Sequence, residues 1–398
     1  MSREENVGGS SRKVRRGSPP AQAVDDEAGV AAASGESRKR TRKGENFINP
    51  ENVTLHSTDF KFEEVAPSVQ TVIATADPLC RKVVAKDEVE KLYSAQQEKW
   101  EQHYVHTQSQ FFPMKNYICK AFPSLLALKQ RIQTEAISAE GVDARPSLVI
   151  MECGCGTGSV VLPLMRYLGG IEDAGYSAEG MATPTSSDLT APPPAETLED
   201  ADLTQNGLRV DADSTKPLLQ PMHYVCFDIS ATAVKLLARH DDCKRFVSAG
   251  GKVTTFVHDI AADGNSVPLP DGCPAIADKI FLIFVLCAVP VPKMGHALQK
   301  LRQHLKPGTG ELLFRDYAVF DHNHARFAEH RNEVVEGSYV KGDGTHQYFF
   351  EKDATAQLFQ RAGFEVVSLE YHCNRVENRS NRKVMNKIFL NGVFRLKE

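Results

Sequence analysis

A glycine-rich turn offers the clearest chemistry in this sequence. Residues 148–159 read LVIMECGCGTGS, an apolar run that ends in Glu152 and opens into alternate glycines, among them Gly154 and Gly156. Glycine lets a backbone approach a ligand closely and adopt positive φ. The spacing G-x-G-x-G differs from the G-x-G-x-x-G of nicotinamide sites. The turn therefore predicts a ligand held at a strand-to-helix junction, and it disfavours a nicotinamide dinucleotide.

Acidic residues follow at the ends of two later apolar runs. Asp228 could accept both hydroxyls of a ribose, and Asp259 could accept the amino group of adenine, with Ile260 against the base. Ile283, in the next apolar run, is expected to line the same cleft or to be plain core. The alternative roles are a helix cap for Asp228 and a turn for Asp259. The order of these residues along the chain favours an adenosine-containing ligand.

Cations and aromatic residues gather after the fifth apolar run. Arg315, Asp316 and Tyr317 end that run and are predicted to orient a substrate, Asp316 through an exocyclic amine. Downstream, residues 339–350 suit either a flipped base stacked on a ring or a β-hairpin that turns at residues 342–344. The predicted nucleic-acid contacts are Lys115, Arg326 and Lys341. No metal is predicted, because the histidine and cysteine pairs lack further ligands at metal-site spacing.

Alternating strand and helix patterns position these groups. Ligands in such sheets bind at the carboxyl ends of the strands, where the glycine turn and both aspartates fall. The alternation predicts a mostly parallel α/β sheet covered on both faces. The expected strands are Leu148–Glu152, His223–Asp228, Val253–His258, Lys279–Leu286, Glu311–Arg315, Phe364–Glu370 and Lys387–Phe394, and the expected helices are Ser159–Leu168, Ala231–His240, Lys293–Leu305 and Lys352–Ala362.

The chain divides into three predicted parts. Residues 1–45 form a disordered basic tail, residues 46–145 an N-terminal extension with a helical lid, and residues 146–398 the main domain. Within the extension, Trp100 and Tyr104 share one face of a helix predicted from Lys86 to Gln110. Residues 169–221 hold ten acidic side chains against two basic ones and predict a disordered insertion in the main domain.

Composition sets further bounds. The net charge of −4 argues against a uniformly basic nucleic-acid binder, although the basic clusters at residues 12–16 and 38–43 could grip phosphates or direct the protein to the nucleus. No apolar run approaches the ~20 residues of a membrane span. Nine scattered cysteines fit reduced thiols. We therefore expect no membrane association, and a cytoplasmic location with the nucleus as a second site.

Taken together, the motifs resemble the eukaryotic tRNA 3-methylcytidine methyltransferases. The resemblance covers residues 93–394 except the insertion, and includes FRDY at residues 314–317 and GDGT at residues 342–345. It implies a class I methyltransferase fold with a seven-stranded, Rossmann-like sheet, and transfer of a methyl group from S-adenosylmethionine to cytidine 32 of certain tRNAs. It implies cofactor contacts at Trp100, Tyr104, Gly154, Gly156, Asp228, Asp259, Ile260 and Ile283.

Two departures from that family bear on the substrate. PMKNY at residues 113–117 stands where the family usually has a Lys-Asp-Arg-like stretch, and the acidic insertion is atypical. Substrate choice is therefore open, as is the need for a protein partner that helps to select the tRNA. The alternatives are a methyltransferase of the same fold that acts on a protein or a small molecule, and a non-catalytic module that binds a tRNA or a partner enzyme.

Overall fold

The computed structural model describes residues 58–76, 84–106, 115–138, 147–171, 217–330, 332–377 and 382–397. The predicted tail, residues 1–45, and most of the predicted insertion, residues 172–216, lie outside these ranges. No helix in the described part of the chain is long and apolar enough to cross a membrane.

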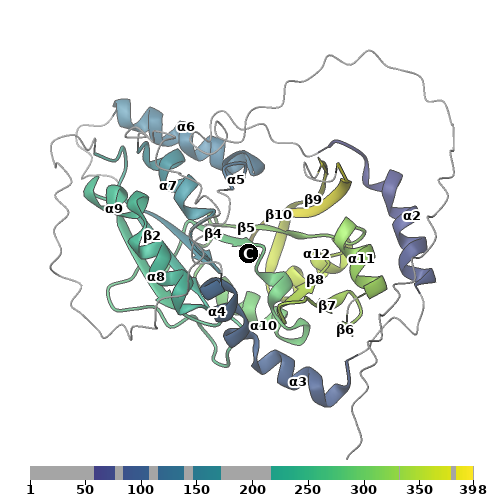
Figure 1. Cartoon of the computed structure of the whole chain (residues 1–398). Coiled ribbons are helices and arrows are strands. Elements are labelled where there is room, and N and C mark those ends of the chain that lie inside the picture. The colour runs from purple at the N-terminus through teal and green to yellow at the C-terminus, as the bar shows by residue number, and fades with distance from the viewer. Residues whose placement is uncertain are drawn as a thin grey trace, which may run out of the picture. The chain divides into compact units, whose positions relative to one another are not determined.

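A seven-stranded sheet forms the centre of the molecule, in the order β3-β2-β1-β4-β5-β10-β9 (Figure 1). The first five strands pair in parallel, and β10 pairs antiparallel with both β5 and β9. The strands are β1 (Leu148–Cys153), β2 (Met222–Asp228), β3 (Lys252–Val257), β4 (Lys279–Ile283), β5 (Glu311–Tyr317), β9 (Phe364–Glu377) and β10 (Val384–Leu396). This topology confirms the predicted class I methyltransferase fold.

The central strands were predictable because they are covered on both faces. Every residue of β1 and of β4 is buried, so both strands are mostly apolar, with Glu152 in β1 and Lys279 in β4 as the charged members. One face packs on α10 (Val291–Arg302) and α12 (Lys352–Arg361). The other face packs on α5 (Ile118–Ala121), α6 (Pro123–Ser138), α7 (Val161–Gly169), α8 (Ala231–Arg239) and α9 (Asp241–Ser248).

The strand ends differ from the predicted ones at a functionally relevant place. The fourth strand was expected to run to Leu286, but β4 ends at Ile283. Phe284 has a φ of 59°, and the 3-10 helix η4 (Leu286–Ala288) follows. Positive φ is uncommon for a residue with a bulky side chain and cannot continue a strand. The chain therefore turns away from the sheet at Phe284.

The N-terminal extension is helical, with a break. In place of one helix from Lys86 to Gln110, the structure has α3 (Lys86–Ser94) and α4 (Gln96–His106), separated at Ala95. Helix α4 packs on α8 at the end of the sheet. Helix α2 (Phe62–Thr75), which the sequence did not predict, packs on α11 (His322–His330).

A small second sheet follows β5. Strands β6 (Asn332–Val335), β7 (Ser338–Val340) and β8 (His346–Tyr348) pair antiparallel in that order. The β7–β8 pair is the hairpin that residues 342–344 allowed as one of two interpretations. Its base is attached to the end of β5, since the Phe350 N–H donates to the Tyr317 carbonyl over 2.8 Å.

Truncation of Phe314 should strongly destabilise the domain. The Phe314 ring lies edge-on to Phe350 and Phe359, each with its centroid 5.3 Å away, and is fully buried. Phe→Ala in such a core costs about 3–5 kcal/mol of unfolding free energy. Urea denaturation of the Phe314→Ala protein should show that loss.

The matched control is Val367→Ala on β9, since that side chain is 45% exposed. It should change the unfolding free energy by no more than about 0.5 kcal/mol. Equal losses in the two variants would contradict the packing described here.

Candidate functional site

A cleft of about 460 Å³ opens at the carboxyl edge of β1, β2 and β4. This size is typical of a small-molecule site. Its wall joins the glycine turn, the ends of β2 and β3, the start of α10 and the helices α3 and α4. The residues that line it include Tyr93, Gln96, Trp100, Tyr104, Gly154, Asp228, His258, Asp259, Ile260, Phe284, Val285 and Lys293.

The glycine turn forms the floor of this cleft, with φ of 69° at Gly154 and 51° at Gly156. A Cβ at Gly154 would lie 2.3 Å from a Val285 methyl carbon, and one at Gly156 would lie 2.7 Å from the Tyr104 hydroxyl oxygen. Neither position can take a larger residue without displacing the wall or the lid. The spacing of these glycines is thus explained by both conformation and space.

Asp228 connects the ends of the first two strands. Its Oδ2 accepts from the Gly156 N–H over 2.8 Å, and its Oδ1 accepts from the Ser230 N–H over 2.9 Å. The carboxyl is buried, and burial raises the pKa of Asp228 to about 6, although these backbone donors oppose the shift. Each oxygen keeps a second lone pair, so the side chain can still accept from ligand hydroxyls.

Asp259 and Ile260 line the cleft beyond the end of β3. Asp259 Oδ1 accepts from the Ala261 N–H over 2.8 Å, which fixes the turn. The buried Lys300 ammonium, from α10, donates to the Ile260 carbonyl over 2.9 Å and to the Ala262 carbonyl. No sequence pattern predicts this role of Lys300, because its partners are backbone carbonyls. Asp259 and Ile260, both predicted to contact the cofactor, therefore lie on a loop that Lys300 of α10 stabilises.

Helix α4 closes the cleft from above. Trp100 and Tyr104 line it, as their shared helix face predicted, with ring centroids 6.1 Å apart. Between them, the Glu101 carboxylate accepts from the Ser230 hydroxyl over 2.6 Å and from both the N–H and the hydroxyl of Thr232. Burial raises the pKa of Glu101, but these hydrogen bonds outweigh it and the net pKa is lowered. Sequence reasoning missed Glu101, which attaches the lid to the start of α8.

Ile283 does not reach the cleft. Its side chain is 4% exposed and packs in the core under α5 to α7. The chain turns at Phe284, which has a positive φ, and the Phe284 side chain lines the cleft instead. Its ring centroid lies 5.0 Å from that of Tyr317 and 5.6 Å from that of Phe389. Phe284 thus takes the place predicted for Ile283.

Lys115 is placed differently from its predicted phosphate contact. Its ammonium donates to the Ser159 hydroxyl over 2.5 Å at the end of the glycine turn. Burial lowers the pKa of Lys115, and the nearby Glu152 carboxyl opposes that shift. The same burial raises the pKa of Glu152, which Lys115 in turn lowers. Lys115 and the buried Glu152 thus favour each other's charged forms, and the Lys115 ammonium has a partner within the protein; its contact with RNA stays a prediction.

Arg315 and Asp316 are also turned inward. Arg315, 2% exposed, donates to Asn391 Oδ1 and stacks on the Phe389 ring at 4.3 Å. The Asp316 carboxylate accepts from the Cys287 N–H and the Tyr317 N–H, each over 2.9 Å, and is fully buried. Neither side chain lines the cleft, so their effect on a substrate would pass through η4 and Tyr317. The predicted direct contact of Asp316 with a base is not supported.

The two other predicted nucleic-acid residues have separate environments. Arg326 is exposed on α11, with its guanidinium 5.3 Å from the Phe327 ring centroid. The Lys341 ammonium lies 5.1 Å from the centroid of the Trp100 ring, at the lid. The structure therefore brings Lys341 to the cofactor cleft and leaves Arg326 on a different surface.

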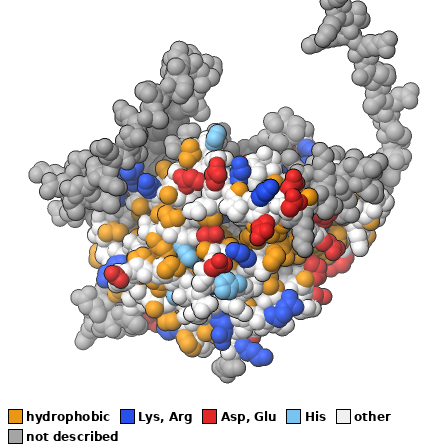
Figure 2. All heavy atoms as spheres, turned by 90° about the horizontal axis from the view of Figure 1, so that it is seen from below, with side chains coloured by type: hydrophobic (Ala, Val, Ile, Leu, Met, Phe, Trp, Pro, Cys, Tyr) orange, Lys and Arg blue, Asp and Glu red, His pale blue; other side chains and the backbone are white. Residues whose placement is uncertain are grey.

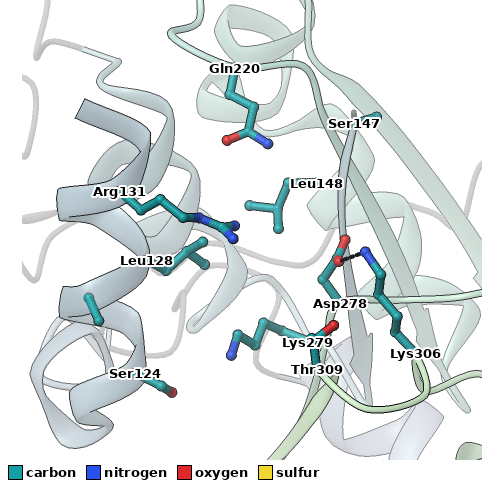
Figure 3. Close-up of a pocket in the computed structure, with 11 residues that line it drawn as sticks. Ser124, Leu128, Arg131, Ser147, Leu148, Gln220, Asp278, Lys279, Lys306 and Thr309 are labelled. Atoms are coloured by element: carbon teal, nitrogen blue, oxygen red, sulfur yellow. Dashed lines mark hydrogen bonds and ion pairs between the residues drawn. The ribbon is translucent and has the colours of Figure 1, made fainter. Parts of the chain in front are cut away.

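A second cavity, of about 520 Å³, lies at the opposite, amino edge of the sheet (Figure 3). Arg131 points into it from α6, and its wall includes Lys279 and Lys306. Each lysine is paired, Lys279 with Glu311 over 2.5 Å and Lys306 with Asp278 over 2.7 Å. None of the predicted site residues lines this cavity, so we assign the chemistry to the cleft at the carboxyl edge.

Comparison with known proteins agrees with this geometry. The family model described as "Methyltransferase domain" matches residues 126–369, more than half of the 398 residues. The chain belongs to this methyltransferase family. Within the family, it is 25% identical to the zebrafish (Danio rerio) protein named tRNA N(3)-cytidine methyltransferase METTL2, over 96% of this chain and 97% of that one.

Two further relatives carry similar names. Human METTL2B, also named as a tRNA N(3)-cytidine methyltransferase, is 36% identical over 42% of this chain and 41% of its own. The Schizosaccharomyces pombe protein named tRNA N(3)-methylcytidine methyltransferase trm141 is 24% identical over 77% of this chain and 95% of its own. These two relatives therefore match about two fifths and about three quarters of the chain.

The residues present fit S-adenosylmethionine, the cofactor of this class of methyltransferase. Gly154 lines the cleft together with Asp228 and Asp259, and Gly156 is held beside it by its hydrogen bond to Asp228. Asp228 can receive ribose hydroxyls, Asp259 and Ile260 can receive adenine, and Trp100 and Tyr104 would cover the ligand. The individual contacts remain predictions.

Removal of the Glu101 carboxylate should weaken cofactor binding. Glu101→Ala loses hydrogen bonds to a charged group, each worth about 1.5–3 kcal/mol, so the Kd for S-adenosylmethionine should rise at least tenfold. Calorimetric titration measures this change. Glu98→Ala, on the exposed side of the same helix, is the matched control and should bind as the wild type does. Equal Kd values in the two variants would show that Glu101 does not hold the lid.

Cofactor affinity should also fall with pH. The predicted ribose hydroxyls would donate to the ionised form of Asp228, which is lost as the pH drops through its pKa of about 6. At pH 5 roughly a tenth of the molecules keep the carboxylate, so the Kd should be about tenfold higher than at pH 7. Asp228→Asn should bind weakly at both values without this dependence. A wild-type Kd that is constant from pH 7 to pH 5 would refute the assignment.

Proposed function

We propose that this protein is an S-adenosylmethionine-dependent tRNA methyltransferase that forms 3-methylcytidine at position 32 of the anticodon loop. The observation that carries the proposal is a methyltransferase cleft with an intact glycine turn and both strand-end aspartates, in a chain that aligns over nearly its full length with a tRNA N(3)-cytidine methyltransferase. Position 32 comes from the resemblance of the motifs.

A local group of cations supports an RNA substrate. Strand β10 pairs Phe389 with Tyr317, so the β9–β10 hairpin extends past the end of β5 above the carboxyl edge of the sheet. Burial lowers the pKa of His322, and so do the nearby charges of Lys387, Lys383 and Arg326. The same hairpin carries two exposed arginines, Arg375 and Arg382, of which Arg382 pairs with Glu377 over 3.1 Å. Phosphates contacted by such a group would fix the orientation of the tRNA.

The charge is local, as the net value of −4 requires. The face of the molecule in Figure 2 carries acidic and basic side chains interspersed with apolar ones. A long basic groove is therefore not the mode of RNA binding that this surface supports. The cations beside His322 would instead direct a small part of the tRNA toward the cleft.

An aromatic wall at the mouth of the cleft suits a flipped base. Phe284, Tyr317 and Phe389 lie within 6 Å of one another, with centroids 5.0, 5.6 and 5.8 Å apart. Stacking on such rings stabilises an extruded base by about 1–3 kcal/mol. Phe284 lines the cleft, so a base stacked there would lie next to the cofactor.

The chemistry then requires alignment more than proton transfer. S-adenosylmethionine supplies an activated methyl group on a sulfonium, and N3 of cytosine has an available lone pair. The protein holds the two groups in line and excludes water, which can supply much of the rate enhancement. Trp100 and Tyr104 exclude water from above, and the glycine turn fixes the cofactor below. Arg315 and Asp316 would position the Tyr317 backbone and η4 without touching the base.

Two finer expectations belong to this proposal. A partner protein that helps to select the tRNA would explain how a chain with few exposed cations near the cleft distinguishes among tRNAs. A cytoplasmic location is supported by the nine scattered cysteines, which fit reduced thiols, and the nucleus as a second location by the basic clusters at residues 12–16 and 38–43.

Purified protein should transfer radiolabelled methyl groups from S-adenosylmethionine to total tRNA. Ribonuclease added before the reaction should abolish incorporation, and mass spectrometry of the digested tRNA should place 3-methylcytidine at position 32. Asp228→Ala should lose activity at cofactor concentrations that saturate the wild type. Label that stays with protein or with a small molecule after ribonuclease treatment would instead support the alternative acceptors, and cofactor binding without any transfer would support a non-catalytic module.

A further inference from the structure

The lid helix α4 is held from two sides, and its second attachment is the turn of the β7–β8 hairpin. Gln96, Trp100 and His103 share one face of α4, at spacings of four and seven residues. That face meets the hairpin turn at residues 341–346. Glu101 and Tyr104, by contrast, face α8 and the glycine turn. The lid is thus clamped between the start of α8 and a hairpin that lies about 240 residues later in the chain.

Two side-chain contacts join the lid to the turn. His103 Nδ1 lies 3.3 Å from Asp343 Oδ2, and the Lys341 ammonium lies 5.1 Å from the centroid of the Trp100 ring. A cation over a tryptophan face contributes about 0.5–2 kcal/mol, depending on its exposure. The Trp100 ring itself lines the cleft, so Lys341 acts on a residue of the cofactor site.

Two hydrogen bonds also join helix α4 to the β7–β8 turn. The Gln96 amide donates to the Gly344 carbonyl over 3.2 Å, and its oxygen accepts from the His346 N–H over 3.2 Å. Gly344 has a φ of 82°, and a Cβ there would lie 3.0 Å from the Lys99 side chain. The buried Gln96 side chain therefore hydrogen-bonds to the backbone of the turn at two places, and Gly344 lets the turn approach the helix closely.

The turn is preorganised for these contacts. Asp343 Oδ1 accepts from the Thr345 N–H over 3.0 Å and from the Thr345 hydroxyl over 2.6 Å, which leaves Oδ2 directed to His103. The base of the hairpin is fixed to the end of β5, since the Val319 N–H donates to the Phe350 carbonyl over 2.9 Å. The position of the turn is therefore set by the attachment of the hairpin to the end of β5.

We propose that the β7–β8 turn, through Lys341 and Asp343, is a positioning element of the cofactor site that holds Trp100 and the lid closed over the cleft. The apparent cofactor affinity is then proportional to the fraction of molecules in which the lid is closed. This inference rests on the proposed function only for the identity of the cofactor. It assigns to Lys341 a contact with the lid in place of the predicted contact with RNA.

Trp100 makes a direct test possible, because it is the only tryptophan of the chain. Its fluorescence reports the lid alone. In the cofactor-free Lys341→Met and Asp343→Asn proteins, acrylamide should quench Trp100 roughly twice as strongly as in the wild type. The Kd for S-adenosylmethionine should rise about tenfold in each variant as the closed fraction falls. Turnover at saturating cofactor should stay within about twofold of the wild type, since the lid then closes on the ligand.

Lys352→Met is the matched control. It removes an exposed ion pair, Lys352 with Glu370 at 2.9 Å, that joins α12 to β9 away from the lid. This variant should quench and bind as the wild type does. Asp343→Asn keeps an oxygen that can accept from Thr345, so the turn should fold, and the urea midpoint of both hairpin variants should match that of the wild type.

Two results would overturn the proposal. One is unchanged quenching and unchanged Kd in both hairpin variants. The other is a loss of cofactor affinity that comes with an equal loss of unfolding free energy, since the turn would then serve general stability. The quenching, the Kd and the unfolding free energy are all measured without tRNA. A protein that binds the cofactor as described but methylates no tRNA would therefore refute the proposed function and leave this inference intact.

Discussion

The site depends above all on the Asp228 carboxylate and its two backbone donors. Through Gly156 and Ser230 it connects the end of β2 to the glycine turn and to the start of α8. Glu101 extends the connection to the lid through the same Ser230. A single buried carboxyl thus fixes the floor, the side wall and the cover of one cleft relative to each other. Because its charge is desolvated, each donor that stabilises it also stabilises the arrangement around it.

The fold was largely predictable because parallel strands that are buried on both faces have mostly apolar sequences. The seven main strands were all expected; the buried β1, β2 and β4 are mostly apolar in sequence, whereas β3, β9 and β10 mix apolar with polar residues. The cofactor cleft was predictable for a related reason. Its groups lie at the ends of consecutive strands, and the topology of a parallel sheet brings such ends to one edge.

The direction of side chains near the acceptor was not predictable. Ile283 and Phe284 exchange roles because of one backbone angle, the positive φ at Phe284, and no pattern in the sequence indicates it. Arg315 and Asp316 follow strand alternation into the interior, where Asn391 and the Cys287 N–H become their partners. Lys115 was expected to contact phosphate, but its nearest acidic group, Glu152, is more than thirty positions away in sequence. Charge alone therefore predicted the residue types and not their surroundings.

The residues on either side of segment 172–216 have an evolutionary consequence. Helix α7 ends, and β2 begins, at the amino edge of the sheet, where a Cβ on Gly169 would lie 3.2 Å from the Leu218 side chain. The described residues that flank this segment are therefore neighbours on the side of the sheet away from the cleft. Insertions, deletions and changes of charge in that stretch can accumulate between species with no displacement of a catalytic atom, so its sequence should diverge faster than any other part of the main domain.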